Sequence, residues 1–283
     1  MIQGRRYRVR AIETGTFTLD GGAMFGVVPK PLWERQIACD ARNGIRLAMR
    51  ALLLQGEGRT LLVDCGLGAG FDDAWADRYG LQPRETTLFA SLAAAGVAPS
   101  DVTDLVVTHL HFDHTGGVTT PDASGRLVPT FGHARHHVQA AHLAHALAPT
   151  PKDRASFLAA RFAPVRDAGL FVTHAGPAEV APGVSVLPVC GHSPGMQLVR
   201  VDDGPLQLLY LADLVPTRAH LSLPWIMAYD NEPLVTLREK ESLVVPFARG
   251  GGVLAFEHDP VLAAGRFDWV DGKPVLNEEV DLT

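Results

Sequence analysis

The stretch DLVVTHLHFDHTGG, residues 104–117, joins a short apolar run to four side chains that can bind metal ions. The run DLVVT is typical of a short buried β-strand. His109, His111, Asp113 and His114 follow it within six residues. Alternate residues of an extended backbone point to the same side, so His109 and His111 can converge on one ion. The turn that follows directs the other two side chains toward a second ion, and the spacing therefore predicts two adjacent metal sites.

The donor types in this stretch narrow the choice of metal. Imidazole nitrogens and carboxylate oxygens without a thiolate suit zinc, manganese or iron better than calcium or magnesium. The chain has 12 histidines, and eight of them lie between His109 and His145. Five of these eight belong to GHARHHVQAAHLAHA and are predicted to take surface or capping positions rather than to bind metal: His133, His136, His137, His142 and His145.

Three later segments each place one polar side chain at the end of a predicted strand. His192 stands in GHSPG after GVSVLPVC, Asp213 ends the apolar run LYLAD, and His258 lies in AFEHD. A single histidine or aspartate in such a place is often only a cap or a turn former. A two-ion site needs more ligands than one loop supplies, so we predict that these three residues complete it.

The rest of the chain alternates predicted strands with helices. ETTLFASLAAAGV (residues 85–97) and TLREKESLVVPFAR (236–249) have helical spacing, and the first predicts a β-α-β unit that ends in DLVVT. No linker or low-complexity tract divides the chain, so we expect one layered α/β domain over residues 1–283. Residues 15–44 and 216–233 read as long irregular loops, and such loops commonly form walls or lids of a site.

Charge and hydropathy exclude several classes of protein. The chain has 31 acidic and 25 basic side chains, a formal net charge of −6, and no basic block that could follow a phosphate backbone. Nucleic acid is not an expected partner. The start MIQGRRYRVR lacks the apolar stretch of a secretion signal, and no apolar run approaches the ~18 residues of a membrane span. We expect a cytoplasmic protein without membrane association. Three widely spaced cysteines argue against a disulfide framework.

HLHFDH, GHSPG, the aspartate of LYLAD, the histidine of FEHD and the upstream TLLVDCG together resemble the metallo-β-lactamase superfamily. The resemblance covers Leu61 to Asp259 and implies an α/β fold, the four-layer αβ/βα sandwich, with a metal pair at one edge. By the same resemblance Asp64 supports the ligand loop from outside the centre. The implied ligands are His109, His111 and His192 for one ion, Asp113, His114 and His258 for the other, and Asp213 as the bridge between them.

Within the superfamily, LDGGAMFGVVPK (residues 19–30) is similar to the N-terminal segment of the lactonase-like branch, which includes acyl-homoserine lactonases. That resemblance implies two zinc ions, with manganese or iron as alternatives. A hydroxide shared by the ions would open a lactone or cleave an ester, and Asp113 would shuttle a proton. It also admits a homodimer. Ser193 and Met196 depart from the common GHTPGH form, which leaves the substrate open.

Candidate substrate contacts come from the two predicted loops. Tyr229 is the first candidate for a hydrogen-bond donor to the substrate and His220 the second, although both could simply pack. An apolar pocket mouth suits a small-molecule substrate with an apolar portion, and the same side chains could equally belong to the core. The candidates for this mouth are Met24, Phe25, Trp33, Trp225 and Met227.

Other functions remain open at this point. A glyoxalase II-like thioesterase or a phosphotriesterase would share the metal ligands. A nuclease would require an electropositive face, which this charge balance does not provide. The non-enzyme alternative is a degenerate ligand-binding module of the same fold, which would have lost a ligand. A measurement of metal content distinguishes this binding module from the hydrolases, because about two ions per chain are expected of a hydrolase.

Overall fold

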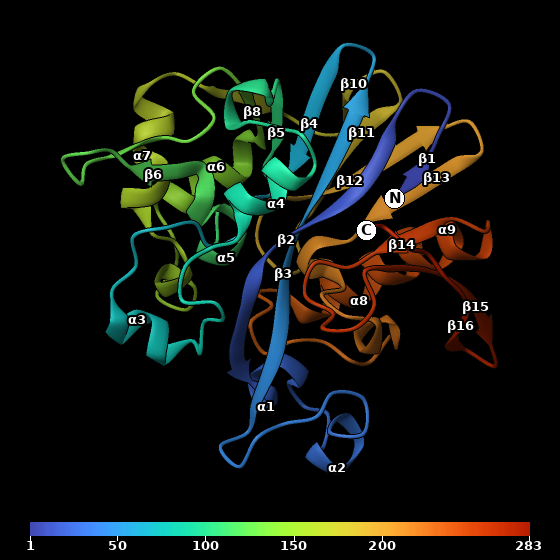
Figure 1. Cartoon of the computed structure of the whole chain (residues 1–283). Helices are drawn as coiled ribbons and strands as arrows, with labels where there is room; N and C mark the ends of the chain where they lie inside the picture. Colours follow the sequence, from blue (N-terminus) through green and yellow to red (C-terminus); the bar gives the residue numbers. More distant parts are fainter.

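The computed structural model describes all 283 residues and contains two seven-stranded sheets (Figure 1). In spatial order the first sheet consists of β1 (Ile2–Gln3), β2 (Arg8–Asp20), β3 (Gly44–Gly56), β4 (Arg59–Val63), β5 (Asp104–Val106), β8 (Arg135–Gln139) and β9 (Phe171–His174). The second consists of β10 (Ala178–Ala181), β11 (Val184–Val189), β12 (Met196–Asp203), β13 (Leu206–Tyr210), β14 (Val253–Ala255), β15 (Ala264–Val270) and β16 (Lys273–Glu279). A separate pair is formed by β6 (Thr119–Pro121) and β7 (Leu127–Pro129).

Both large sheets are mixed. Strands β4, β5, β8 and β9 pair in parallel, as do β13 and β14, while the remaining neighbours are antiparallel. The α-helices are α1 (Gly21–Phe25), α2 (Lys30–Trp33), α3 (Asp73–Arg78), α4 (Leu88–Ala94), α5 (Phe112–Thr115), α6 (Ala140–Leu147), α7 (Ala159–Asp167), α8 (Pro233–Glu239) and α9 (Val245–Arg249). Short 3-10 helices are η1 (Pro99–Asp101), η2 (Gly116–Val118), η3 (Arg154–Ser156), η4 (Ala212–Leu214) and η5 (Arg218–Leu221), and η6 (Lys240–Val244) is a π-helix. No helix combines the length and the apolar character needed to cross a bilayer.

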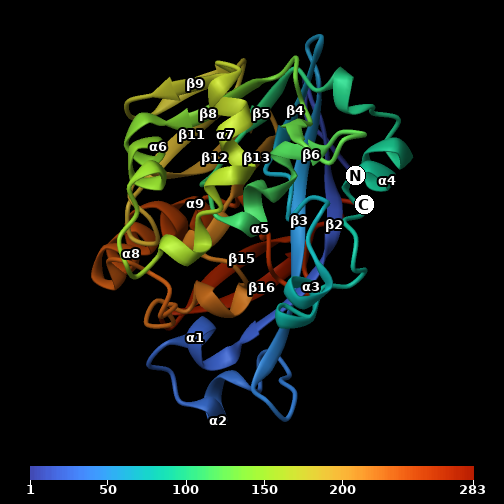
Figure 2. The same ribbon diagram turned by 90° about the vertical axis from the view of Figure 1, so that its left-hand side faces the viewer.

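The alternation of side chains along the central strands builds the layers. Leu52 and Leu54 of β3 face the second sheet and join the largest core cluster. Leu53, between them, faces the other way and packs with Leu88 and Leu92 of α4. A strand buried on both faces reads as a continuous apolar run, which explains RALLLQ. Helices therefore cover the outer face of the first sheet, as Figure 2 shows for α6 and α7, and the predicted αβ/βα sandwich is confirmed.

The N-terminal excursion differs from its prediction as a loop over residues 15–44. Strand β2 continues to Asp20, and the excursion beyond it holds α1 and α2 at the end of the long β2–β3 pair (Figures 1 and 2). Asp20 caps α1 by accepting a hydrogen bond from the backbone of Ala23 at 2.8 Å. Phe17 and Trp33 belong to a separate core cluster under this excursion. Burial of this kind gives the segment a fixed place beside the site.

The predicted helices are present with shorter bounds. The segment 85–97 forms α4, and Gly96 takes the left-handed conformation that ends it, with φ 73°. The segment 236–249 is divided into α8, the π-helix η6 and α9. π-helical turns are frequent at functional sites. The first residue of this one, Lys240, donates hydrogen bonds to the carbonyls of Ser222, Leu223 and Trp225.

Candidate metal centre and active site

The loop after β5 carries four of the predicted ligands and is fastened to the neighbouring strand β4. Asp64 follows β4 and adopts a left-handed conformation with φ 56°. Its carboxylate accepts hydrogen bonds from the backbone nitrogen of Thr108 at 2.8 Å and from the Thr108 hydroxyl at 2.6 Å. The backbone nitrogen of Cys65 donates to the carbonyl of His114 at 2.9 Å. The two ends of the ligand loop are thereby held against the first sheet.

The second sheet supplies the other three predicted ligands from separate strand ends. His192 lies after β11, Asp213 lies in η4 after β13, and His258 lies after β14. Ala212, just before the aspartate, has φ 44°, a conformation that an L-residue keeps only where its surroundings enforce it. The ends of the two sheets meet at one edge, and the seven side chains converge there although they span about half the chain.

Asp213 stands between two groups of ligands. Its Oδ2 lies 3.3 Å from His192 Nε2 and 3.8 Å from His109 Nε2. Its Oδ1 lies 3.2 Å from His258 Nε2 and 3.5 Å from His114 Nε2. Each carboxylate oxygen thus faces a different group, which is the arrangement required of a bridging ligand.

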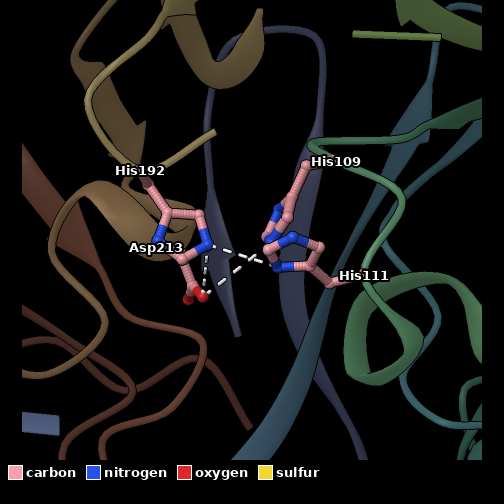
Figure 3. Close-up of side chains that lie close together, drawn as sticks. All are labelled: His109, His111, His192 and Asp213. Carbon is pink, nitrogen blue, oxygen red and sulfur yellow. Dashed lines mark hydrogen bonds and ion pairs between the residues drawn. The ribbon is translucent and has the colours of Figure 1, made fainter. Parts of the chain in front are cut away.

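One group, which we call the His192 subsite, consists of His109, His111 and His192 and points inward around a common centre (Figure 3). His192 Nε2 lies 3.3 Å from His111 Nδ1. Two nitrogens bound tetrahedrally to one zinc ion at about 2.0–2.1 Å would be separated by about 3.3 Å. The spacing between these nitrogens fits a shared ion.

The other group, the His114 subsite, consists of Asp113, His114 and His258. His258 Nε2 lies 3.2 Å from His114 Nε2 and 3.6 Å from Asp113 Oδ2. All three residues are at most 7% exposed. Two imidazoles and a carboxylate, with Asp213 as a fourth ligand, provide a second mixed nitrogen and oxygen site of the kind that zinc, manganese and iron accept.

The outer nitrogens of the imidazoles are fixed by partners that orient the rings. His192 Nδ1 lies 2.9 Å from Asp230 Oδ1, and His258 Nδ1 donates to the carbonyl of Ala48 at 2.8 Å. His114 Nδ1 lies 2.8 Å from Glu257 Oε2 and 3.2 Å from Asp64 Oδ2. Such outer contacts fix the tautomer of a metal-binding histidine.

Sequence reasoning found Asp64 but missed Asp230, Glu257 and Tyr210, whose hydroxyl donates to Glu257 at 2.7 Å. Glu257 has a local signal, because it directly precedes His258 at the end of a buried strand. Asp230 has none. It approaches His192 from 38 residues away through the fold alone.

Electrostatics and unsatisfied atoms show that the donor set fits divalent cations. His109 Nε2 and Asp213 Oδ1 are buried and have no hydrogen-bond partner, which is costly unless something binds there. Burial and neighbouring imidazoles lower the pKa of His109 and His111 well below the usual value, so both rings remain neutral with free lone pairs. Burial opposes ionisation of Asp213, but His114 and His258 outweigh it and lower its pKa.

A pocket of about 260 Å³ opens onto the centre and is lined by both polar and apolar side chains. His111, Asp113 and Asp213 form part of its floor. Tyr229, which is 38% exposed, also lines it, and burial together with nearby acidic groups raises its pKa to about 12. The phenol therefore stays protonated and can donate a hydrogen bond at neutral pH.

The structure separates the predicted pocket residues into two sets. Met24 and Met227 line the pocket, whereas Phe25, Trp33 and Trp225 pack beside it in the core of the N-terminal excursion. The rings of Phe25 and Trp33 stack with centroids 5.2 Å apart. These three aromatic residues therefore pack in the core, which was the alternative to a place at the pocket mouth.

His220 lies outside the pocket, so its position does not support a substrate contact. It is 1% exposed, and both ring nitrogens are occupied, one by the hydroxyl of Thr217 at 2.8 Å and the other by the carbonyl of Met24 at 2.8 Å. The ring also stacks on Phe25. It connects η5 to α1, and so helps to fix the N-terminal excursion.

The five histidines of residues 132–146 were predicted to take surface or capping positions, and three of them do not lie at the surface. His136, His137 and His142 are buried. His137 Nε2 lies 3.0 Å from Asp104, and His142 Nε2 accepts from the backbone nitrogen of Leu110 at 2.8 Å. Hydrogen bonds within the core occupy both ring nitrogens of His137 and His142, whereas His136 Nε2 is buried without a partner. None of the five belongs to the groups that could hold a metal ion.

The fold and this centre together define a metal-dependent hydrolase with a histidine-rich binuclear site. Residues 50–261 match the metallo-beta-lactamase superfamily, and the chain belongs to that family. The match includes every predicted ligand.

Individual relatives agree with this assignment. Probable metallo-hydrolases of Mycobacterium tuberculosis and Mycobacterium bovis are each 28% identical over 273 residues, which cover 85% of this chain and 82% of theirs. A probable metal-dependent hydrolase from Staphylococcus aureus has a similar crystal structure, with a TM-score of 0.87, 28% identity, and coverage of 99% of this chain and 100% of that chain. The fold is also shared by AidC, a dizinc quorum-quenching lactonase, at 18% identity and a TM-score of 0.81, covering 100% and 97% of the two chains.

Proposed function

We propose that this protein uses two zinc ions to hydrolyse a lactone or ester that carries an apolar portion. The observation that carries the proposal is the position of Asp213, whose two oxygens face the two subsites at the floor of a partly apolar pocket. When bound, a pair of divalent ions supplies Lewis acidity and activates water at neutral pH. Manganese and iron are the alternatives to zinc that these ligands accept.

The protein's own residues have separate roles in this proposal. Asp113 lies at the pocket floor, where its carboxylate can take a proton from the attacking water and pass it to the leaving oxygen. Tyr229 donates a hydrogen bond to the oxygen of the substrate on which charge develops. Met24 and Met227 contact the apolar portion. Exclusion of water by these side chains strengthens the polar contacts.

One structural comparison and the character of the pocket support a lactone or ester as the substrate class. AidC is a lactonase whose structure was obtained with a product bound, and its fold extends over the whole of this chain. The pocket described here contains one exposed cation, Lys152, and several apolar side chains, which is a poor match to the polyanionic phosphate esters of nucleic acids. Fold alone does not select a substrate, so the assay must decide.

The test is a substrate panel run on protein with a measured metal content. Acyl-homoserine lactones of different chain lengths, simple aryl esters, a thioester and a phosphotriester would be compared after reconstitution with zinc, manganese or iron. We expect about two ions per chain and the highest kcat/KM on a lactone or an ester. Preference for the thioester or the phosphotriester would replace the proposed substrate, and absence of bound metal would favour a ligand-binding module.

The role of Asp113 has its own test in the same assay. Asp113→Asn keeps the shape of the side chain but removes the proton-accepting charge. Because Asp113 also belongs to the His114 subsite, the metal content of the variant is measured beside its turnover. We expect the variant to fold and to lose about 10²-fold or more in kcat, the usual scale of general acid-base catalysis. Full turnover would refute the proton-transfer role.

A further inference from the structure

One wall of the pocket, residues 222–231, contains no helix or strand yet is held at both ends by lysine side chains. Lys240 Nζ donates to the carbonyls of Ser222 at 2.8 Å, Leu223 at 3.2 Å and Trp225 at 3.0 Å. Lys152 Nζ donates to the carbonyls of Tyr229 at 2.7 Å and Asp230 at 2.9 Å. The chain has only four lysines, and two of them serve this pocket wall.

The two lysines differ in what they leave free. Lys240 is 1% exposed, comes from the π-helix η6, and uses all three ammonium hydrogens on three carbonyls. Lys152 is exposed, lines the pocket, and donates to two carbonyls with its three ammonium hydrogens. Lys240 therefore fixes one end of the pocket wall within the core, whereas Lys152 holds the other end at the pocket mouth.

The carbonyls that Lys152 holds belong to two residues with different contacts. The side chain of Tyr229 lines the pocket, and the carboxylate of Asp230 lies 2.9 Å from Nδ1 of the predicted ligand His192. Asp153, which follows Lys152 in the chain, accepts a hydrogen bond from the side-chain amide of Asn231 at 2.8 Å. The segment 150–156 therefore fastens three consecutive residues of the pocket wall, and through one of them the ring of a metal ligand.

We propose that Lys152 is a positioning residue, which sets the place of Tyr229 in the pocket and, through Asp230, the orientation of His192. The inference rests on the proposed function and adds to it a residue that does not itself bind metal. Loss of the ammonium leaves the two carbonyls to water and weakens the hold on the C-terminal end of the pocket wall, where the hydrogen bond between Asn231 and Asp153 remains. The orientation of a metal-binding histidine depends on such outer contacts, so metal retention and turnover should change together.

The test compares Lys152→Met with Lys152→Arg and with Lys273→Met, a matched control at an exposed lysine of β16. In Lys152→Met we expect faster amide hydrogen exchange confined to residues 222–231 and neighbours of His192. We also expect about tenfold weaker retention of one ion against a chelator, and kcat lowered about tenfold with a smaller change in KM. Lys152→Arg should restore most of these values, because a guanidinium can also donate to two carbonyls.

Several results would overturn the inference. Unchanged exchange and metal retention in Lys152→Met would remove the positioning role. A raised KM with unchanged kcat would make Lys152 a substrate contact instead. The exchange and chelator measurements need no substrate, so failure of the whole substrate panel would overturn the proposed function while these two readouts still judged Lys152. A wild-type protein that binds no metal would overturn both.

Discussion

The two subsites of the metal centre have similar ligands but different supports. In the His114 subsite, the outer nitrogen of His114 meets Glu257 and Asp64, which are both 0% exposed and lie within the sandwich. In the His192 subsite, the outer nitrogen of His192 meets Asp230, which belongs to the pocket wall. One subsite is therefore braced by the core of the protein and the other by a segment that also lines the substrate pocket.

This difference indicates that one subsite is held rigidly by the core, whereas the other is coupled to the pocket wall. Buried carboxylates on strand ends hold the ring of His114, which does not line the pocket. The His192 subsite shares its support with Tyr229, so we expect movement of the pocket wall to change both ion binding and the proposed substrate contact. If this division holds, substitutions at the two supports should affect the two subsites separately.

The largest effect is expected where the two subsites are joined. Asp213→Asn removes the negative charge shared by both ions, so metal content should fall below two per chain and kcat/KM by about 10³-fold or more. Metal analysis, circular dichroism and steady-state kinetics on the same preparation would measure this. Two tightly bound ions with normal turnover in the variant would show that Asp213 is not the bridge.

Substitutions at the two supports, Glu257 and Asp230, should have the next largest effect, and each should weaken metal binding at one subsite. We expect Glu257→Gln to weaken one ion and Asp230→Asn the other, each by about 10-fold to 100-fold, the usual range for outer contacts of metal ligands. Asp230→Asn should also raise KM, because Asp230 belongs to the pocket wall, whereas Glu257→Gln should not. Chelator competition with cobalt-substituted protein would distinguish the two ions. Glu279→Gln in β16, an exposed site, is the control, and release of the same ion by both variants would contradict the division.

Removal of the phenol from the pocket wall should have a smaller effect. Tyr229→Phe should lower kcat/KM about tenfold by deleting one hydrogen bond to the substrate, without changing metal content. Because the pKa of Tyr229 is raised to about 12, deprotonation of the phenol should not limit the pH profile of the wild type below that value. An unchanged kcat/KM in the variant would leave Tyr229 as packing only.

The last prediction concerns stability rather than turnover, at a buried histidine outside the centre. Burial lowers the pKa of this histidine, His136, to about 4. In the metal centre, by contrast, the neighbouring Asp213 outweighs burial and raises the pKa of His258 to about 9. The unfolded chain binds a proton at His136 below about pH 6.5 and the folded chain does not, so stability is lost as the pH falls from 6.5 toward 4. His136→Leu should therefore reduce the loss between pH 7 and pH 5 by about 2 kcal/mol. Urea unfolding of the metal-free protein at both pH values would measure it, and an identical pH dependence would exclude His136.

Much of the fold was predictable because its central strands are buried on both faces. RALLLQ, TLLVD and DLVVT are short apolar runs, and their order with the helix at 85–97 predicted a layered α/β arrangement. The excursion after β2 was not predictable in this way. Its helices α1 and α2 have four or five residues each and exist because Phe17 and Trp33 share a core with loops from the other end of the chain.

The sequence by itself determined the type, order and spacing of the predicted metal ligands. Four of them follow one strand within six residues, and extended backbone fixes which side chains share a side. The three others follow apolar strands, where a single polar residue is often only a cap or a turn former, so their order after HLHFDH carried the prediction. These are local properties, so they survive without knowledge of the fold.

Only the tertiary structure decided which residues support the ligands and shape the pocket. Asp230 reaches His192, Glu257 reaches His114 and Lys152 reaches Tyr229, across 38, 143 and 77 positions respectively. No periodicity connects such residues, because their contacts depend on how the two sheets and the intervening loops pack. Hydrogen bonds to buried groups are then formed by whichever partners the packing brings near, since a buried polar group without a partner is costly.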